Sequence, residues 1–291
     1  MAIKEVAMPE HPLQRFFKSQ RTRPTFEWER YQLRDVLIID HPRCQAVFSR
    51  QGGQLLHFQP QGQKPWLWCA AHWPQVGPIR GGVPVCWPWY GRHPSEGVWP
   101  AHGWARLLDW KLIESHESEA GVSLHWRLKL WDWQADLFAE LGQRMDLRLE
   151  TQHEDSSPCQ FSHALHAYWR ISDVADVALQ GLDGVQGYDH LIRRSCQQEG
   201  ELRVVGGCQR EFDHSGPLHL QDETWARRLG IDTGESTSTV VWHPGRRPLM
   251  GVAGSEALEF VCVEAAAGGG ERLSLAPGER AELSLQAYLV H

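Results

Sequence analysis

Long apolar runs are missing from this chain of 291 residues. No uninterrupted apolar segment approaches the roughly 18 residues that a transmembrane helix needs. The first residues, 1–20, carry charges and lack the hydrophobic stretch of a secretory signal. We therefore expect a protein with no membrane partner that is located in the cytoplasm.

A surplus of basic residues is also missing. The 29 Lys and Arg residues are outnumbered by 36 Asp and Glu residues, so the formal net charge at pH 7 is −7. Proteins that bind nucleic acid usually carry the opposite balance, and we expect no nucleic-acid partner. An anionic ligand would need a local arginine cluster that works against the overall charge.

Cysteine pairs of the CxxC type are absent as well. Seven cysteines are scattered along the chain, several of them in apolar, strand-like segments. An odd, unpatterned set without a secretory signal predicts reduced thiols that behave as small hydrophobic side chains. We expect all seven to be structural.

Alternation of apolar and polar residues is what the chain has in quantity. It runs through residues 124–130, 145–150 and 282–289 and is typical of strands with one buried face. Helical periodicity is weak, and only residues 11–20 suggest one or two short turns. Fifteen Trp, nine Phe and five Tyr require a packed interior and exclude a disordered chain. The pattern predicts a largely antiparallel all-β protein with few short helices.

The domain organisation follows from the absence of any repeat, linker or low-complexity tract. We expect one β-sandwich domain over residues 1–291, with residues 1–25 as a peripheral N-terminal extension. A short turn cluster at 276–279 lies between strand-like segments 272–275 and 281–290, and it predicts a hairpin.

The least strand-like part of the chain contains the segments IRGGVPVCWPWYG (79–91) and HGWAR (102–106). Their Gly-Gly and Pro-aromatic pairs indicate tight turns beside a pocket. Arg80 and Arg106 lie in these loops, and guanidinium groups bind phosphate through paired hydrogen bonds. Three tryptophans that could stack on a sugar accompany them: Trp87, Trp89 and Trp104. The alternative is that the tryptophans belong to the core and the arginines to the surface.

The segment FSHALHAYWRI (161–171) contains His163 and His166. In an extended strand these two side chains point to opposite faces, so they cannot bind one metal ion together, and we expect no metal site. His166 would share its face with Tyr168 and Arg170. A single histidine on a strand is otherwise a structural residue with a satisfied hydrogen bond.

The segment LEFVCVEAA (258–266) is almost entirely apolar and carries one carboxylate near its end, Glu264. Such a residue is either a strand-end surface charge or part of a partly buried site. Burial would raise its pKa, and a neighbouring Arg or His would lower it. With a histidine in the same cavity, it would supply the base of an acid/base couple.

Taken in order, these segments resemble the aldose 1-epimerase (galactose mutarotase) superfamily, and more narrowly its hexose-6-phosphate mutarotase branch. The resemblance runs from GGQLL and GQKP, through RGGVPVCWPWYG, HGWAR, ALHAYWRI and VVWHPG, to FVCVEAA and LAPGE. The combination of RGGxPxxWPWxG with HGxAR is the specific part of the match.

The resemblance implies a galactose mutarotase-like β-supersandwich whose cleft holds a catalytic His166 and Glu264. It implies Arg80 and Arg106 at the phosphate of a hexose 6-phosphate, with His102 beside the sugar. The implied reaction interconverts the α and β anomers of glucose 6-phosphate and related aldohexose 6-phosphates by ring opening and closure. Glu264 would remove the O1 proton while His166, as imidazolium, protonates the ring oxygen. No metal or cofactor is required, and we expect a monomer.

Two positions depart from the family pattern. Ala101 precedes His102 where a polar residue is common, and Gln209 stands where an Asp that contacts sugar hydroxyls is expected. We retain Gln209 as a substrate-binding position, since Asp213 could replace it only if the strand register shifts. These changes bear on substrate choice more than on the acid/base pair.

The sequence alone leaves two other functions open. A non-catalytic sugar-phosphate-binding or regulatory protein could use the same cleft, because a fold does not imply turnover. A metal-dependent barrel enzyme of the cupin type is favoured by the 16 histidines but disfavoured by the lack of an HxH-plus-Glu cluster.

Overall fold

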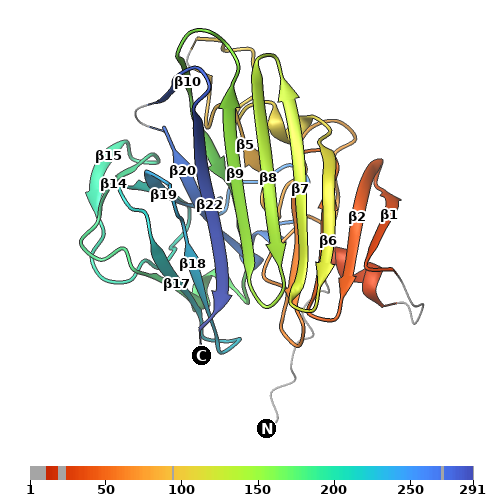
Figure 1. Cartoon of the computed structure of the whole chain (residues 1–291). Coiled ribbons are helices and arrows are strands. Elements are labelled where there is room, and N and C mark those ends of the chain that lie inside the picture. Colours follow the sequence, from red (N-terminus) through yellow and green to blue (C-terminus); the bar gives the residue numbers. More distant parts are fainter. Residues whose placement is uncertain (1–10, 19–23, 94, 270–271, 291) are drawn as a thin grey trace.

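Strands dominate the structure, a computed structural model that describes residues 11–18, 24–93, 95–269 and 272–290 (Figure 1). Within these ranges the helical segments are four short 3-10 turns: η1 (Pro12–Phe17), η2 (Ala105–Leu107), η3 (Val174–Asp176) and η4 (Glu256–Glu259). No helix in the described part of the chain is long and apolar enough to cross a membrane. The predicted all-β class with few short helices is confirmed.

One antiparallel sheet of eight strands forms the broad front layer of Figure 1. Its strands, in spatial order, are β13 (Val177–Gln180), β17 (Pro217–Asp222), β18 (Arg227–Asp232), β22 (Arg280–Leu289), β9 (Met145–His153), β8 (Trp133–Leu141), β7 (Gly121–Leu130) and β6 (Lys111–Ser118). The three alternating segments of the sequence lie in β7, β9 and β22. Their apolar residues, among them Leu124, Leu147 and Leu285, are buried as predicted.

A second antiparallel sheet lies behind the first. Its strands are β15 (Arg194–Gln197), β14 (Gln186–Asp189), β16 (Cys208–Phe212), β19 (Ser238–His243), β20 (Phe260–Ala267), β11 (His163–Leu165) and β5 (Val85–Cys86), and β12 (Tyr168–Arg170) also pairs with β20. Two smaller sheets complete the fold: β1 (Phe26–Tyr31), β2 (Arg34–His41), β3 (Cys44–Ser49) and β4 (Gln54–Pro60) in one, β10 (Cys159–Phe161) and β21 (Leu273–Leu275) in the other.

The main hydrophobic core lies between the two large sheets. Leu147 and Leu285 of the front sheet belong to the same buried cluster as Val263 and Ala265 of β20. Each fully buried side chain of this size contributes about 1.5–3 kcal/mol. Because successive side chains of a strand point to opposite faces, Glu264 of β20 points away from this core, yet all eight residues of β20 are buried. The second face of β20 is therefore covered by other parts of the chain.

The predicted hairpin at residues 276–279 is wrong. β21 pairs with β10, whereas β22 pairs with β9 and β18. After the turn, β22 runs along β9 from Arg280 to Ala287, and it pairs with β18 only over its last residues, Gln286–Leu289, so β22 and β21 belong to different sheets. A short link indicates proximity of two segments but does not determine which strands exchange hydrogen bonds.

The segment 161–171 is extended but is divided into β10, β11 and β12 instead of one strand. The predicted division of its faces holds across the breaks. Ala167 and Trp169 are part of the main core, whereas the rings of His166 and Tyr168 stack on the other side, 4.9 Å apart.

The expected N-terminal extension, 1–25, falls mostly on residues 1–10 and 19–23, which lie outside the described residues. Its described part is η1, which buries Leu13 and Phe16 in a separate cluster with Val36 and Ile38 of β2. Residues 11–18 are thus packed against the four-stranded sheet.

Candidate active site

The candidate site lies on the face of the second sheet that points away from the core. Strand register places Tyr168 opposite Cys262 and Cys262 opposite Trp242, so these three side chains form a row across β12, β20 and β19. Glu264 follows two residues after Cys262 and therefore shares this face. His166 lies just outside β11, and its ring is 6.0 Å from that of Trp242.

His166 and Glu264 meet at the centre of this face. The His166 Nε2 atom is 3.3 Å from the Glu264 Oε1 atom, and the side chains are only 12% and 1% exposed. The His166 backbone N–H donates to the carbonyl of Pro84, the residue just before β5, which ties His166 to that segment. Two buried atoms of the pair, His166 Nδ1 and Glu264 Oε2, have no hydrogen-bond partner. Unpartnered polar atoms in a buried position are costly and indicate a functional role.

Burial shifts the two groups in opposite directions. Burial raises the pKa of Glu264 well above its usual value, and the like charge of Glu211 raises it further. Burial also lowers the pKa of His166 well below its usual value, with a smaller effect from His102 and the two arginines, Arg106 and Arg80. In the empty site the neutral form, with a protonated Glu264, is therefore favoured over the ion pair. Both forms hold one proton, and the 3.3 Å contact is short enough for the proton to move between them.

Arg80 and Arg106 lie beside this pair without an acidic partner among the described residues. Arg80 Nη1 donates to the Tyr168 hydroxyl at 3.3 Å, and Arg106 Nη2 donates to the Ala101 carbonyl at 2.7 Å. The Arg106 Nε atom is buried and unpartnered. Several other arginines form ion pairs, as Arg127 does with Asp136 at 2.7 Å. Two uncompensated guanidinium groups next to a buried acid/base pair make a site for an anion.

His102 also belongs to the site. Its ring centre lies 6.0 Å from that of His166 and 5.3 Å from that of Tyr90. Its Nδ1 atom accepts from the Gly91 N–H at 3.4 Å. Burial, followed by the charges of Arg106 and Arg80, lowers the pKa of His102 to about 4, so His102 is a neutral group at physiological pH.

Tight turns bring these loops to the site. Gly82 has φ +60°, and a Cβ atom there would lie 2.0 Å from the Leu55 carbonyl oxygen. Gly103 has φ +75°, and a Cβ atom there would lie 2.1 Å from the Trp87 carbonyl oxygen. Only glycine fits either position. The RGG and HGW motifs thus let Arg80 and His102 approach the second sheet from the loops that flank β5.

For two of the three tryptophans in these loops, the alternative interpretation as core residues is correct. Trp87 is fully buried in the main core, where its indole N–H donates to Thr151 Oγ1 at 3.1 Å. Trp89 is also buried, and it stacks on Trp99. The aromatic rings next to His166 are instead Tyr168 and Trp242, and Tyr90 lies next to His102. Composition alone could not distinguish tryptophans that pack in the core from aromatic residues that line the site, because core tryptophans also occur in the loops that carry the site motifs.

Gln209 lies on β16, exposed, with Trp242 as its register partner. Glu211 on the same strand was not among the predicted site residues. Glu211 is opposite Val240, and Val240 is opposite Glu264, so the two carboxylates occupy one row across three strands. Glu211 accepts from Ser238 Oγ at 2.9 Å and lies 3.3 Å from His190 Nε2. The sequence offered one signal for Glu211: it follows Gln209 by two residues, so the two side chains point to the same face of β16.

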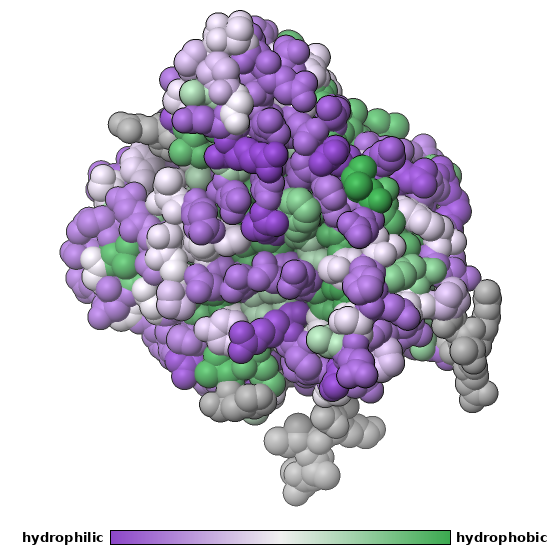
Figure 2. Space-filling model, viewed as in Figure 1, coloured by the Kyte–Doolittle hydropathy of each residue, from purple (hydrophilic) through white to green (hydrophobic). Residues whose placement is uncertain are grey.

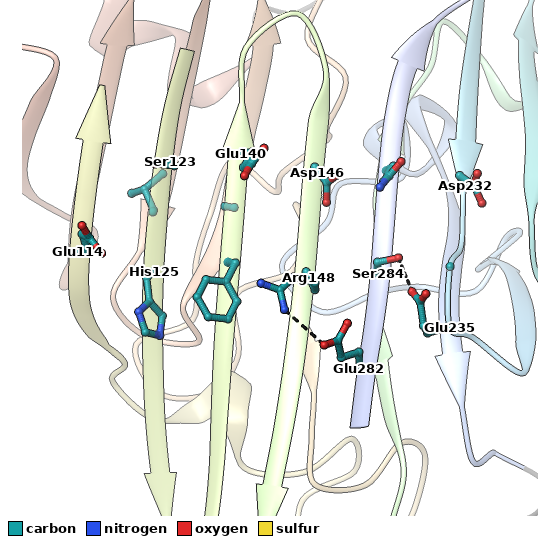
Figure 3. Close-up of a pocket in the computed structure, with 15 residues that line it drawn as sticks. Glu114, Ser123, His125, Glu140, Asp146, Arg148, Asp232, Glu235, Glu282 and Ser284 are labelled. Atoms are coloured by element: carbon teal, nitrogen blue, oxygen red, sulfur yellow. Dashed lines mark hydrogen bonds and ion pairs between the residues drawn. The ribbon is translucent and has the colours of Figure 1, made fainter. Parts of the chain in front are cut away.

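A second hollow, of about 590 Å³, lies on the outer face of the front sheet. Figure 2 shows that this face is largely hydrophilic, and Figure 3 shows carboxylates such as Glu114, Asp146 and Asp232 spread across the sheet. Ser284 donates to Glu235 at 3.0 Å, and Arg148 lies 3.6 Å from Glu282. The core separates this hollow from His166 and Glu264, so it is no part of the candidate active site.

Comparisons with known proteins agree with this arrangement. The aldose 1-epimerase family model matches residues 35–288. A protein of Escherichia coli (strain K12) named "Putative glucose-6-phosphate 1-epimerase" is 32% identical over 256 residues, 80% of this chain and 83% of that protein. A protein of the same name from Salmonella typhimurium is 31% identical over 254 residues, 79% of this chain and 82% of that protein.

The fold has close counterparts among solved structures. The crystal structure of "a putative mutarotase (YeaD)" from Salmonella typhimurium superposes with a TM-score of 0.88 at 23% identity, covering 96% of this chain and 99% of that one. The predicted galactose mutarotase-like fold is thereby confirmed. The extent of the family match and the identity to the E. coli relative show that this chain belongs to the aldose 1-epimerase family.

Proposed function

We propose that the protein is a hexose-6-phosphate mutarotase, which interconverts the α and β anomers of glucose 6-phosphate and related aldohexose 6-phosphates. The observation that carries the proposal is the buried His166–Glu264 contact of 3.3 Å beside two arginines that lack an acidic partner in the described chain. The names of the E. coli and Salmonella relatives support the same substrate class.

The pair performs ring opening by two proton transfers. The Glu264 carboxylate removes the proton of the O1 hydroxyl, and the O–H electrons form the C1 carbonyl. The bond from C1 to the ring oxygen breaks, and its electrons stay on that oxygen, which takes the proton of the His166 imidazolium. Rotation about C1–C2 then presents the other face of the aldehyde, and the reverse transfers close the ring as the other anomer.

Burial makes both groups more reactive in this sequence. A carboxylate with a raised pKa is a stronger base, and an imidazolium with a lowered pKa is a stronger acid. Ring opening leaves Glu264 protonated and His166 neutral, which is the form that burial favours. Each positioned acid or base accounts for about 10²–10⁴ in rate, which is sufficient for a reaction that already proceeds in water.

Arg80 and Arg106 bind and orient the substrate through its 6-phosphate. Neither guanidinium group forms an ion pair with a carboxylate among the described residues. Phosphate binding therefore does not require an existing ion pair to break, and its favourable free energy is not reduced by that cost. Each hydrogen bond to a charged group is worth about 1.5–3 kcal/mol. His102, neutral and close to both His166 and Tyr90, is suited to hydrogen bonding with sugar hydroxyls.

A non-catalytic sugar-phosphate binder would use the same arginines but would have no need of Glu264. A buried carboxyl group with an unpartnered oxygen lowers stability, and an apolar residue would replace it at less cost. This observation favours turnover over binding alone. We further infer that the chain forms a single domain, since one core joins residues of both large sheets, and we expect this domain to act as a monomer.

Exchange NMR of glucose 6-phosphate anomers tests the proposal. Micromolar protein should increase the rate of exchange between the two anomeric signals well above that of buffer. Binding of the sugar phosphate without any increase in exchange would establish the non-catalytic alternative instead.

A further inference from the structure

Cys262 lies beside the acid/base pair and takes no part in the proposed proton transfers. It is fully buried between the rings of Tyr168 and Trp242, which are its register partners on β12 and β19. Its thiol points to the same face as Glu264, two residues further along β20. A thiol, an imidazole and a carboxylate therefore meet at one point on this face of the sheet.

These three groups have the spacing of a metal site. One donor atom each from His166, Cys262 and Glu264 lie within 4.8 Å of one another. Tetrahedral zinc, with bonds of about 2.0–2.3 Å, holds its donor atoms roughly 3.3–3.6 Å apart. His166 Nε2 and Glu264 Oε1 are already at 3.3 Å, so only a small movement of the thiol is needed.

A second observation points to a ligand at this position. Glu264 Oε2 is buried without a partner although its side chain is only 1% exposed. The His166 side chain is 12% exposed and that of Glu264 is 1% exposed, so a small ion would approach the three donors from the side of His166. Nitrogen, sulfur and oxygen donors together suit zinc, whereas magnesium and calcium prefer oxygen alone.

We propose that His166, Cys262 and Glu264 bind one zinc ion, with a water molecule as the fourth ligand, and that this ion inhibits the enzyme. Binding releases the thiol proton and the shared proton of the pair to solvent, and no group is oxidised or reduced. The ion then occupies the two groups that move protons in catalysis. The binding site is independent of the reaction, but the inhibition rests on the proposed mutarotase function.

The chain offers a matched control. Among the described residues, one other set of three groups has suitable spacing, His153, Asp155 and Cys159, at the turn between β9 and β10. Its cysteine is not fully buried, and these residues are not part of the site described above. Zinc bound there should leave turnover unchanged, so Cys159→Ala separates the two sites.

Binding is measured first, without reference to activity. Titration of the metal-free protein with Co²⁺ should produce the charge-transfer absorption of a thiolate–cobalt bond in the wild type and in Cys159→Ala, and Zn²⁺ should displace it. In Cys262→Ala this absorption should disappear from the site, and the affinity for zinc should fall by about a hundredfold or more. Melting curves check that the variant is folded.

Inhibition is measured next by exchange NMR. At free Zn²⁺ about ten times the measured Kd, anomer exchange should fall roughly tenfold, because only the metal-free fraction turns over. The chelator EDTA should restore it, and Mg²⁺ at the same concentration should have no effect. Cys262→Ala should retain basal exchange and lose the sensitivity to zinc, whereas Cys159→Ala should remain as sensitive as the wild type.

The outcomes separate this proposal from the function on which part of it rests. A wild-type protein that exchanges anomers but shows no thiolate–cobalt absorption, or a Cys262→Ala protein inhibited like the wild type, would overturn the zinc site and leave the mutarotase function intact. A protein that binds zinc through Cys262 but never exchanges anomers would support the site and overturn the function.

Discussion

Replacement of Arg80 by Met tests how the site selects a phosphorylated sugar. The substitution keeps the length and most of the apolar stem of the side chain but removes the guanidinium. It also leaves the Tyr168 hydroxyl without the donor that now lies 3.3 Å away. No ion pair between the described residues is broken, so the loss should fall on ligand binding more than on folding.

The expected magnitude follows from the hydrogen bonds to the phosphate. Arg80 and Arg106 are both partly exposed, and a bond from such a group to a charged ligand is worth about 1.5–3 kcal/mol. This converts to a loss of roughly ten- to hundredfold in kcat/KM for glucose 6-phosphate per arginine. Exchange with unphosphorylated glucose should change little, since glucose has no group at that position to lose.

Exchange NMR with both sugars provides the assay. Arg80→Lys should recover only part of the loss, because an ammonium group cannot reproduce the planar, bidentate geometry. Arg43→Met is a suitable control, since Arg43 Nε donates to the Glu119 carbonyl in an exposed turn far along the chain. An Arg80→Met protein with an unchanged preference for the phosphorylated sugar would refute the assignment and direct attention to another basic residue, with Lys64 next.

Two further predictions concern neighbours of the pair, and a third concerns a buried histidine on the other side of the sheet. Tyr168→Phe, which removes the hydroxyl that orients Arg80, should lower kcat/KM for glucose 6-phosphate by about two- to tenfold and spare glucose; an equal loss on both sugars would contradict this role. Glu211→Gln removes the like charge that raises the pKa of Glu264, so the alkaline limb of the rate–pH profile should move to lower pH, and an unmoved limb would argue against the interaction. His163→Leu should flatten the loss of stability in acid. Burial lowers the pKa of His163 to about 3, so between pH 6.5 and 3 only the unfolded chain takes up this proton, and the free energy of unfolding falls by about 1.4 kcal/mol per pH unit. Urea denaturation at pH 7.0 and 5.5 measures this slope, and a variant with the wild-type slope would contradict the reasoning.

Local patterns were enough to predict much of the fold. The alternating segments form β7, β9 and β22, and each of these strands has one face in the core. Every second residue is therefore buried, which is why apolar residues recur with a period of two. Glu264 was recognisable as a candidate because a carboxylate in an apolar strand is expensive unless it serves a purpose. The RGG and HGW motifs were recognisable because only glycine fits their turns.

Pairing across the fold could not be read in the same way. β21 joins β10 instead of β22, since the choice of partner depends on which sheet edges remain free. Trp87 packs in the core although it lies within the site motif, and its sequence neighbours do not reveal the direction of its ring. Glu211 on β16 lies in the same row as Glu264 on β20, with Val240 of β19 between them. This row depends on the register of three strands that are far apart in the sequence.

The contact between His166 and Glu264 also could not be predicted from local sequence. β11 and β12 pair with β20 in a register that places Leu165 opposite Ala265 and Tyr168 opposite Cys262. The two catalytic candidates are brought together between these positions. Family resemblance, and not spacing, was what linked them in the sequence, because nothing local relates residues so far apart.

Exchange NMR of glucose 6-phosphate with the Glu264→Gln protein tests the central claim most directly. The amide keeps the shape of the carboxyl group and removes a buried ionisable group, so the variant should be at least as stable as the wild type. Anomer exchange should nevertheless fall by about 10²-fold or more, and adding His166→Asn should reduce it little further, because the two groups act as a unit. A folded Glu264→Gln protein that exchanges anomers at the wild-type rate would contradict the account.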